Sequence, residues 1–115
     1  SNAQHSFIIE MTTKHLPTIK RVQPDQTITR TNHGVAYPDT GYTGGIKRQS
    51  SKSRQQIAYD VLSDISSQEH ILDALSKQHD SDKFMNPYRR DNSYGFTTSS
   101  QVMMDLNNLK FEFFF

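Results

Sequence analysis

Two polar side chains, Asn32 and Arg54, stand out between residues 29 and 62 as candidates for chemistry. Asn32 lies in the polar end of a predicted strand, and Arg54 lies in the first turn of a helix for which Ser50 or Ser51 is the expected N-cap. At roughly 100° per residue, Arg54 falls on the midline of the helix's apolar face, which comprises Ile57, Ala58, Val61, Leu62 and Ile65. A buried guanidinium is costly without partners, so we expect a polar partner inside the fold. The alternative is that Arg54 extends to water or pairs with a structural carboxylate.

A basic cluster surrounds this helix start and admits a second kind of chemistry. Lys47, Arg48 and Lys52 stand close to Arg54 in the sequence and could meet phosphate, aided by the helix N-terminus. Because no aromatic residues alternate with these cations as they do in single-strand binders, a solvated basic patch is the competing interpretation. The segment Gly41–Lys47 is rich in glycine but lacks the spacing of a phosphate loop, so we expect no nucleotide cofactor there.

Metal and thiol chemistry are not expected within this chain. The five histidines never pair at the spacing of metal ligands, and the chain has no cysteine for a thiolate site, a disulfide or a nucleophile. His33 follows Asn32, and strand alternation would direct the two side chains to opposite faces. We therefore do not expect both of these residues to serve one site.

Composition points to a small domain with an incomplete core. Of the 115 residues, 33% are hydrophobic, and the mean hydropathy is −0.76. This shortfall predicts that a partner segment completes part of the apolar surface. The net charge of +1 gives no general attraction to nucleic acid or membranes, and no apolar run is long enough to span a bilayer. We expect neither as a partner, and the cellular compartment is not readable from composition.

Both ends of the chain are typical of a fragment of a longer protein. Residues 1–3, Ser-Asn-Ala, are typical of what remains after an affinity tag is removed, and Leu109–Phe115 is a strand pattern ending in three phenylalanines. We expect residues 4–115 to be part of a larger domain.

The predicted elements follow the order strand, strand, helix, helix, strand, strand. This order predicts an α+β fold in which a helical pair covers an antiparallel sheet. Pro17 and Pro24 predict an irregular connection over Lys14–Asp25. One proline and three glycines predict a loop over Gly34–Gln49, namely Pro38, Gly41, Gly44 and Gly45. Ser66 and Glu69 form a capping-box pair for the second helix. The predicted strands are Phe7–Met11, Gln26–Thr31, Gly95–Asp105 and Leu109–Phe115, with a turn near Leu106–Asn108.

Four motifs in sequence resemble the second half of the cysteine N-terminal-nucleophile hydrolases. This group includes choloylglycine hydrolase, penicillin V acylase and acyl-coenzyme A:6-aminopenicillanic acid acyltransferase, also called linear amide carbon-nitrogen hydrolases. The likeness runs over most of Ile8–Phe115. The motifs are Thr31-Asn32-His33, the Gly41-Tyr42 loop with Gly44-Gly45, Ser50-Ser51-Lys52-Ser53-Arg54, and Thr97-Thr98-Ser99-Ser100-Gln101-Val102.

The resemblance implies a four-layer αββα sandwich and a role for each matched residue. In the family an N-terminal cysteine thiolate attacks an amide carbonyl, with its own α-amino group as base. Asn32 matches the asparagine that helps form the oxyanion hole, and Arg54 matches the arginine beside the nucleophile. A guanidinium there favours thiolate over thiol. Tyr37 and Tyr42 are weaker matches to residues lining the acyl pocket.

This chain departs from the family because it lacks the nucleophile. The leading hypothesis is a C-terminal portion of a cysteine-dependent amidohydrolase that acts on a small-molecule amide and needs its missing N-terminal half or a second copy. The alternatives are a non-catalytic binding module that uses the Gly34–Gln49 loop and the basic helix start, and a phosphate or nucleotide binder that uses Lys47, Arg48 and the helix N-terminus. Bile-salt conjugates, penicillin V, acyl-homoserine lactones, other N-acyl amino acids and peptides all remain possible substrates.

Overall fold

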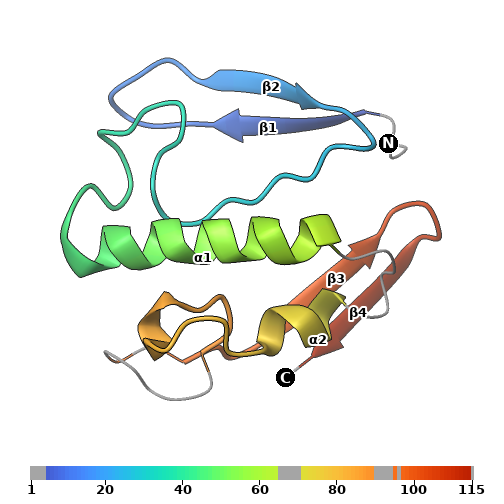
Figure 1. Ribbon diagram of the computed structural model, residues 1–115. Coiled ribbons are helices and arrows are strands. Elements are labelled where there is room, and N and C mark those ends of the chain that lie inside the picture. Colours follow the sequence, from blue (N-terminus) through green and yellow to red (C-terminus); the bar gives the residue numbers. More distant parts are fainter. Residues whose placement is uncertain (1–4, 65–70, 90–94, 96, 115) are drawn as a thin grey trace.

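A computed structural model describes residues 5–64, 71–89, 95 and 97–114 of the chain (Figure 1). In this part of the chain the fold is α+β, as predicted, but the strands form two separate two-stranded antiparallel sheets instead of one sheet covered by a helical pair. The long helix α1 lies between the β1–β2 hairpin on one side and α2 with the β3–β4 hairpin on the other. The elements are β1 (Ser6–Glu10), β2 (Thr18–Val22), α1 (Gly45–Asp64), α2 (Ile71–Ser76), the 3₁₀ turn η2 (Lys83–Met85), β3 (Gln101–Asp105) and β4 (Lys110–Phe114).

The first hairpin confirms one predicted strand and corrects the other. β1 pairs antiparallel with β2, with Ile8 opposite Lys20. The connection predicted over Lys14–Asp25 therefore contains a strand, and the strand predicted over Gln26–Thr31 is absent from the described elements. Pro17 precedes the first residue of β2, a position where a missing amide hydrogen removes no bond from the ladder. The prolines bound this strand instead of excluding it.

Residues 29–33 run antiparallel along α1 instead of pairing with a strand (Figure 1). Thr29 Oγ1 donates to the Gln55 carbonyl at 3.0 Å, and Gln55 Nε2 donates back to the Thr29 carbonyl at 2.9 Å. Four residues nearer the start of the helix, Thr31 Oγ1 donates to the Ser51 carbonyl at 2.6 Å. Side chains thus satisfy backbone groups that a sheet ladder would otherwise satisfy.

α1 begins at Gly45, so Ser50 and Ser51 are not its N-cap. Gly45 has φ of +67°, a conformation that glycine adopts at little cost, and this conformation starts the helix inside the predicted loop. Both serines consequently lie in the body of the helix, where they are fully buried. Arg54 is half-buried beside them, as its place on the apolar face predicts.

The contact between α1 and η2 is fixed by serine hydroxyls around one aromatic side chain. Ser50 Oγ donates to the Phe84 carbonyl at 2.6 Å, and Ser53 Oγ donates to the Met85 carbonyl at 3.1 Å. Phe84 is 3% exposed and is the one buried hydrophobic residue of the described chain. The guanidinium carbon of Arg89 lies 4.3 Å from the centre of the Phe84 ring. The centre of the molecule is therefore held largely by polar contacts.

Asn86 organises the loop that ends at η2. Its Oδ1 accepts the backbone amides of His79 and Asp80 at 2.7 and 2.8 Å. Its Nδ2 donates to the carbonyls of Asp80 and Asp82 at 3.0 and 3.1 Å. The side chain is 2% exposed and uses both its oxygen and its nitrogen.

The C-terminal hairpin confirms the predicted strand pair in a shorter form. β3 and β4 pair antiparallel, with Val102 opposite Phe113 and Met104 opposite Phe111. These four residues share one face of the hairpin, which we call the open face, and they are 41 to 64% exposed.

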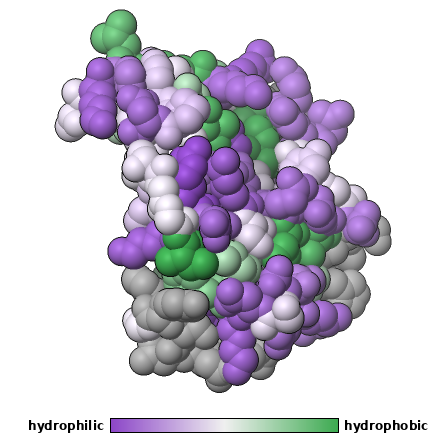
Figure 2. All heavy atoms as spheres, turned by 60° about the vertical axis from the view of Figure 1, so that its left-hand side comes forward, coloured by the Kyte–Doolittle hydropathy of each residue, from purple (hydrophilic) through white to green (hydrophobic). Residues whose placement is uncertain are grey.

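The Ser66–Glu69 capping box lies outside the described residues. Figure 2 shows hydrophobic residues at the surface, interspersed with hydrophilic ones.

Candidate functional site

The side chains of Asn32 and Arg54 meet directly. Arg54 Nη2 donates to Asn32 Oδ1 at 2.9 Å, and Arg54 Nε donates to Ser50 Oγ at 3.2 Å. The polar partner expected for Arg54 is therefore an amide oxygen together with a buried hydroxyl. No carboxylate forms an ion pair with Arg54 among the described residues. The site keeps the positive charge that a structural salt bridge would have neutralised.

A second guanidinium reinforces that charge. Arg89 Nη2 donates to Ser50 Oγ at 3.0 Å, so Arg54 and Arg89 converge on one hydroxyl. Burial lowers the pKa of Arg54, and the neighbouring Arg89 lowers it further. Two adjacent cations in a partly buried place produce a positive potential that favours an anion.

The contacts of Asn32 fix the direction of its amide group. Its backbone nitrogen donates to Ser51 Oγ at 2.7 Å, and its carbonyl accepts from the Tyr42 amide at 2.8 Å. Because Oδ1 accepts from Arg54, Nδ2 is the atom left for a ligand. Within the described part of the chain, Nδ2 has no hydrogen-bond acceptor.

A cleft of about 650 Å³ lies in front of Asn32, between β1 and residues 30–43. Its apolar wall comes from Ile8, Ile9 and Met11 at β1 and just after it. Asn32 lines the cleft together with Thr31, Thr40 and Thr43, and Arg54 is not among the lining residues. A ligand in this cleft can therefore place an apolar group on β1 and a polar group at Asn32.

His33 lines the same cleft as Asn32, but its side chain contacts Ser51 whereas the Asn32 side chain contacts Arg54. Residues 32 and 33 do not form a regular strand, so the alternation of side chains does not apply. His33 Nδ1 lies 2.8 Å from Ser51 Oγ, and Ser51 Oγ donates to Thr31 Oγ1 at 2.9 Å. Burial lowers the pKa of His33, as do the nearby charges of Arg48 and Lys52.

Sequence reasoning did not identify Ser50 and Ser51 as the supports of this site. Ser51 anchors the Asn32 amide, His33 and Thr31, while Ser50 holds Arg54 and Arg89. The signal available was a pair of adjacent serines, which also fits an N-cap. The burial of both serines depends on α1 beginning at Gly45, five residues before Ser50, and the sequence did not indicate that start.

The two candidate tyrosines have different surroundings. Tyr42 is near enough to Arg54 and Arg89 for its hydroxyl to oppose the lowering of the pKa of both. Tyr37 stacks on His15, with ring centres 4.2 Å apart, and its hydroxyl donates to the Leu16 carbonyl at 2.7 Å. Neither tyrosine is among the residues that line the cleft.

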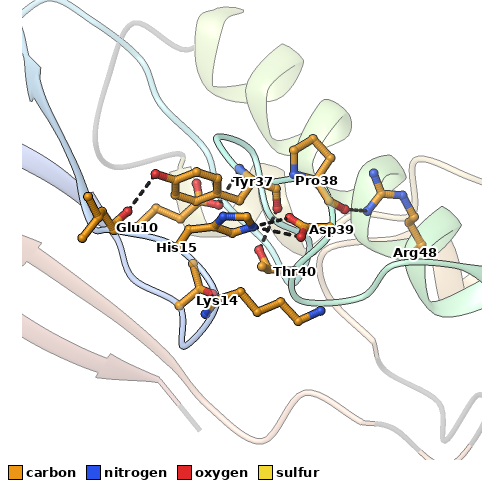
Figure 3. Close-up of polar contacts among 10 residues, drawn as sticks. Glu10, Lys14, His15, Tyr37, Pro38, Asp39, Thr40 and Arg48 are labelled. Atoms are coloured by element: carbon orange, nitrogen blue, oxygen red, sulfur yellow. Dashed lines mark hydrogen bonds and ion pairs between the residues drawn. The ribbon is translucent and has the colours of Figure 1, made fainter.

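The loop that frames the cleft is held by charged side chains (Figure 3). Glu10 accepts backbone amides from Val35, Ala36 and Tyr37, the shortest at 2.9 Å from Ala36. These bonds, that of Ala36 above all, lower the pKa of Glu10. His15 Nε2 lies 2.9 Å from both carboxylate oxygens of Asp39, a contact that lowers the pKa of Asp39.

The two cations considered for phosphate binding also serve this loop. Arg48 Nη1 donates to the Tyr42 carbonyl at 2.8 Å and to the Pro38 carbonyl at 3.4 Å (Figure 3). Lys47 Nζ lies 5.7 Å from the centre of the Tyr42 ring. Across the described ranges, no three histidine, cysteine or acidic side chains form a group that could hold a metal ion. No helix in those ranges is long and apolar enough to cross a membrane.

Comparisons with known proteins found no matching family model, no matching curated protein and no matching solved structure.

Proposed function

We propose that this chain carries the oxyanion-stabilising part of a cysteine-dependent amide hydrolase. The supporting observation is the 2.9 Å contact of Arg54 Nη2 with Asn32 Oδ1, which leaves Asn32 Nδ2 available as a donor. A single donor aimed at the developing oxyanion contributes about 3 kcal/mol in comparable sites. In this proposal, Asn32 donates to the carbonyl oxygen of a linear amide as the tetrahedral intermediate forms.

Arg54 has two roles in this proposal. It holds the Asn32 amide in the orientation that presents nitrogen rather than oxygen. Its charge, which no carboxylate pairs with in the described residues, favours an anionic thiolate nearby. The nucleophilic cysteine belongs to a segment outside this chain, since the chain has none.

The family's αββα sandwich is part of the same proposal. Both hairpins leave large apolar side chains exposed, including Phe7 and Ile9 on β1 and Phe111 and Phe113 on β4. Further strands and a second layer would bury such faces. The acyl part of the substrate would lie against Ile8, Ile9 and Met11 in the cleft.

The test uses the full-length protein that contains this segment. N-terminal sequencing of its mature form should give cysteine, and Asn32→Ala should lower kcat for N-acyl amides by about 100-fold. Arg54→Ala should lower kcat as well, since Asn32 loses its orientation. Asn107→Ala and Arg21→Ala, which change the same residue types at exposed positions, are the matched controls and should retain turnover.

Two results would overturn the proposal. One is a mature protein without an N-terminal cysteine, and the other is undiminished turnover in both Asn32→Ala and Arg54→Ala. Either result would favour the binding module that uses the Gly34–Gln49 loop.

A further inference from the structure

A second groove lies between α1, β2 and the extended segment before Asn32, and it shares Arg30 and His33 with the lining of the first cleft. Its volume is about 790 Å³. Each of the three walls supplies one cation: Lys20 from β2, Arg30 from the extended segment, and Lys52 from α1. Asp25 is the one carboxylate among the described residues that line it. The groove therefore carries an excess of positive charge.

These cations form no ion pair within the described chain, although Glu10 lies near enough to Arg30 for that charge to lower the pKa of Glu10. The ion pairs among the described residues join His15 to Asp39 and Lys110 to Glu112, and neither pair involves the groove. Arg30 donates from Nη1 to the Thr29 carbonyl at 2.8 Å, which leaves its charge in place. An anion bound between the three walls would gain from all three charges at once.

The pKa of one residue that lines the groove is consistent with this positive potential. His33 lines the groove, and after burial the largest causes that lower its pKa are the charges of Arg48 and Lys52. Arg30 adds to the same effect. The ring of His33 therefore carries less positive charge than an exposed histidine would.

An aromatic residue also lines the groove. Tyr59 lines it, is 45% exposed, and follows Lys52 by seven residues on α1. Seven residues correspond to about two helical turns, so the two side chains share one helix face roughly 10 Å apart. A ligand with an anionic end and a flat ring can touch both.

We propose that this groove binds a nucleoside monophosphate, with its phosphate among Lys20, Arg30 and Lys52 and its base against Tyr59. Phosphate fits better than a carboxylate because its oxygens point in several directions and the cations approach from three separate elements. The site differs from the Lys47–Arg48 cluster, whose side chains contact Tyr42 and backbone carbonyls.

The experiment measures binding of adenosine 5′-monophosphate, inorganic phosphate and adenosine to the chain by calorimetry at two salt concentrations. We expect the nucleotide to bind most tightly, and added salt to weaken it. Lys20→Ala, Arg30→Ala and Lys52→Ala should each weaken nucleotide binding by about two- to fivefold, the range for exposed charge pairs. Tyr59→Ala should weaken nucleotide binding but leave phosphate binding unchanged.

Lys77→Ala is the matched control, because it removes an exposed lysine that does not line the groove. Absence of saturable binding by both nucleotide and phosphate would overturn the proposal. Equal effects of Lys77→Ala and Lys52→Ala would also overturn it, since they would indicate a general response to charge. Equal affinity for phosphate and nucleotide would refute the contact with Tyr59.

Discussion

At the scale of single residues, the arrangement around Asn32 depends on buried hydroxyls more than on charges. Ser51 fixes the backbone of Asn32, and Ser50 fixes the guanidinium that holds its side chain. Hydroxyls can accept and donate at once, so two serines on one helix turn can orient an amide and an arginine without neutralising the charge of the arginine. This leaves both functional groups available for a ligand.

Glu10 gives the protein a defined sensitivity to acid. Amide bonds from residues 35–37 lower the pKa of Glu10 in the folded chain, and the unfolded chain lacks them. The resulting stability is present above the ordinary glutamate pKa of about 4.3, and it is lost as pH falls through the lower folded value. We expect the free energy of unfolding, measured with urea across a pH series, to fall below about pH 4.3.

Glu10→Gln should remove part of that acid slope, because an amide side chain does not titrate. The remaining slope should include Asp39, whose pKa the contact with His15 lowers. Parallel pH curves for the wild type and Glu10→Gln would show that the amide contacts do not govern acid stability.

Residue-scale features were predictable where a helix supplied periodicity. The burial of Arg54 followed from the 3.6-residue repeat of its apolar neighbours. Its contact with Asn32 could not be predicted, because the two residues are 22 positions apart in the sequence and no local pattern indicates such a contact.

At the scale of elements, two glycines shape the loop that presents Asn32. A Cβ on Gly34 would lie 2.1 Å from the Tyr37 carbonyl oxygen and 2.4 Å from Thr40 Oγ1. A Cβ on Gly41, which has φ of +68°, would lie 2.3 Å from the Asn32 carbonyl oxygen. The loop backbone can therefore fold closely on itself only without side chains at these positions.

Gly34→Ala should consequently lower the free energy of unfolding by about 1 to 3 kcal/mol, the usual cost of forcing atoms into a filled space. Gly44→Ala is the matched control, because a Cβ there meets nothing within 4 Å. Urea denaturation of both variants measures the difference. Equal stability of the two variants would mean that the loop relaxes freely around Gly34.

Element boundaries were less predictable than element types. The punctuation by Gly44 and Gly45 indicated a loop, yet the positive φ of Gly45 starts α1. Gln26–Thr31 had strand-like residues, but bonds between its threonines and α1 replaced a strand ladder. The second error arises because tertiary hydrogen bonds outweigh local preference. The C-terminal hairpin was predictable since its two alternating segments are neighbours in sequence.

At the scale of the whole molecule, apolar surface exceeds what the described core covers. Phe84 is the one buried hydrophobic residue in the described ranges, while the open face of the β3–β4 hairpin is exposed. Faces of this kind favour association with another apolar surface. The low hydrophobic content in the sequence anticipated this state.

We expect the chain to self-associate as its concentration rises, and Phe111→Lys to reduce that association. The substitution places a charge in the middle of the open face opposite Met104. Sedimentation velocity over a concentration series measures the effect. Leu109→Lys is the control, since Leu109 is 87% exposed in the turn and lies off that face. Association unchanged by Phe111→Lys would exclude the open face as the contact surface.

Asn86 also determines which amide hydrogens exchange together. Its one side chain holds the amides of His79 and Asp80 and the carbonyls of Asp80 and Asp82. The loop can release those amides to solvent only when Asn86 leaves its buried position, which lies next to Phe84 and the α1–η2 contact. Residues 79–86 should therefore open as one cooperative unit with η2, although most of the loop lies at the surface.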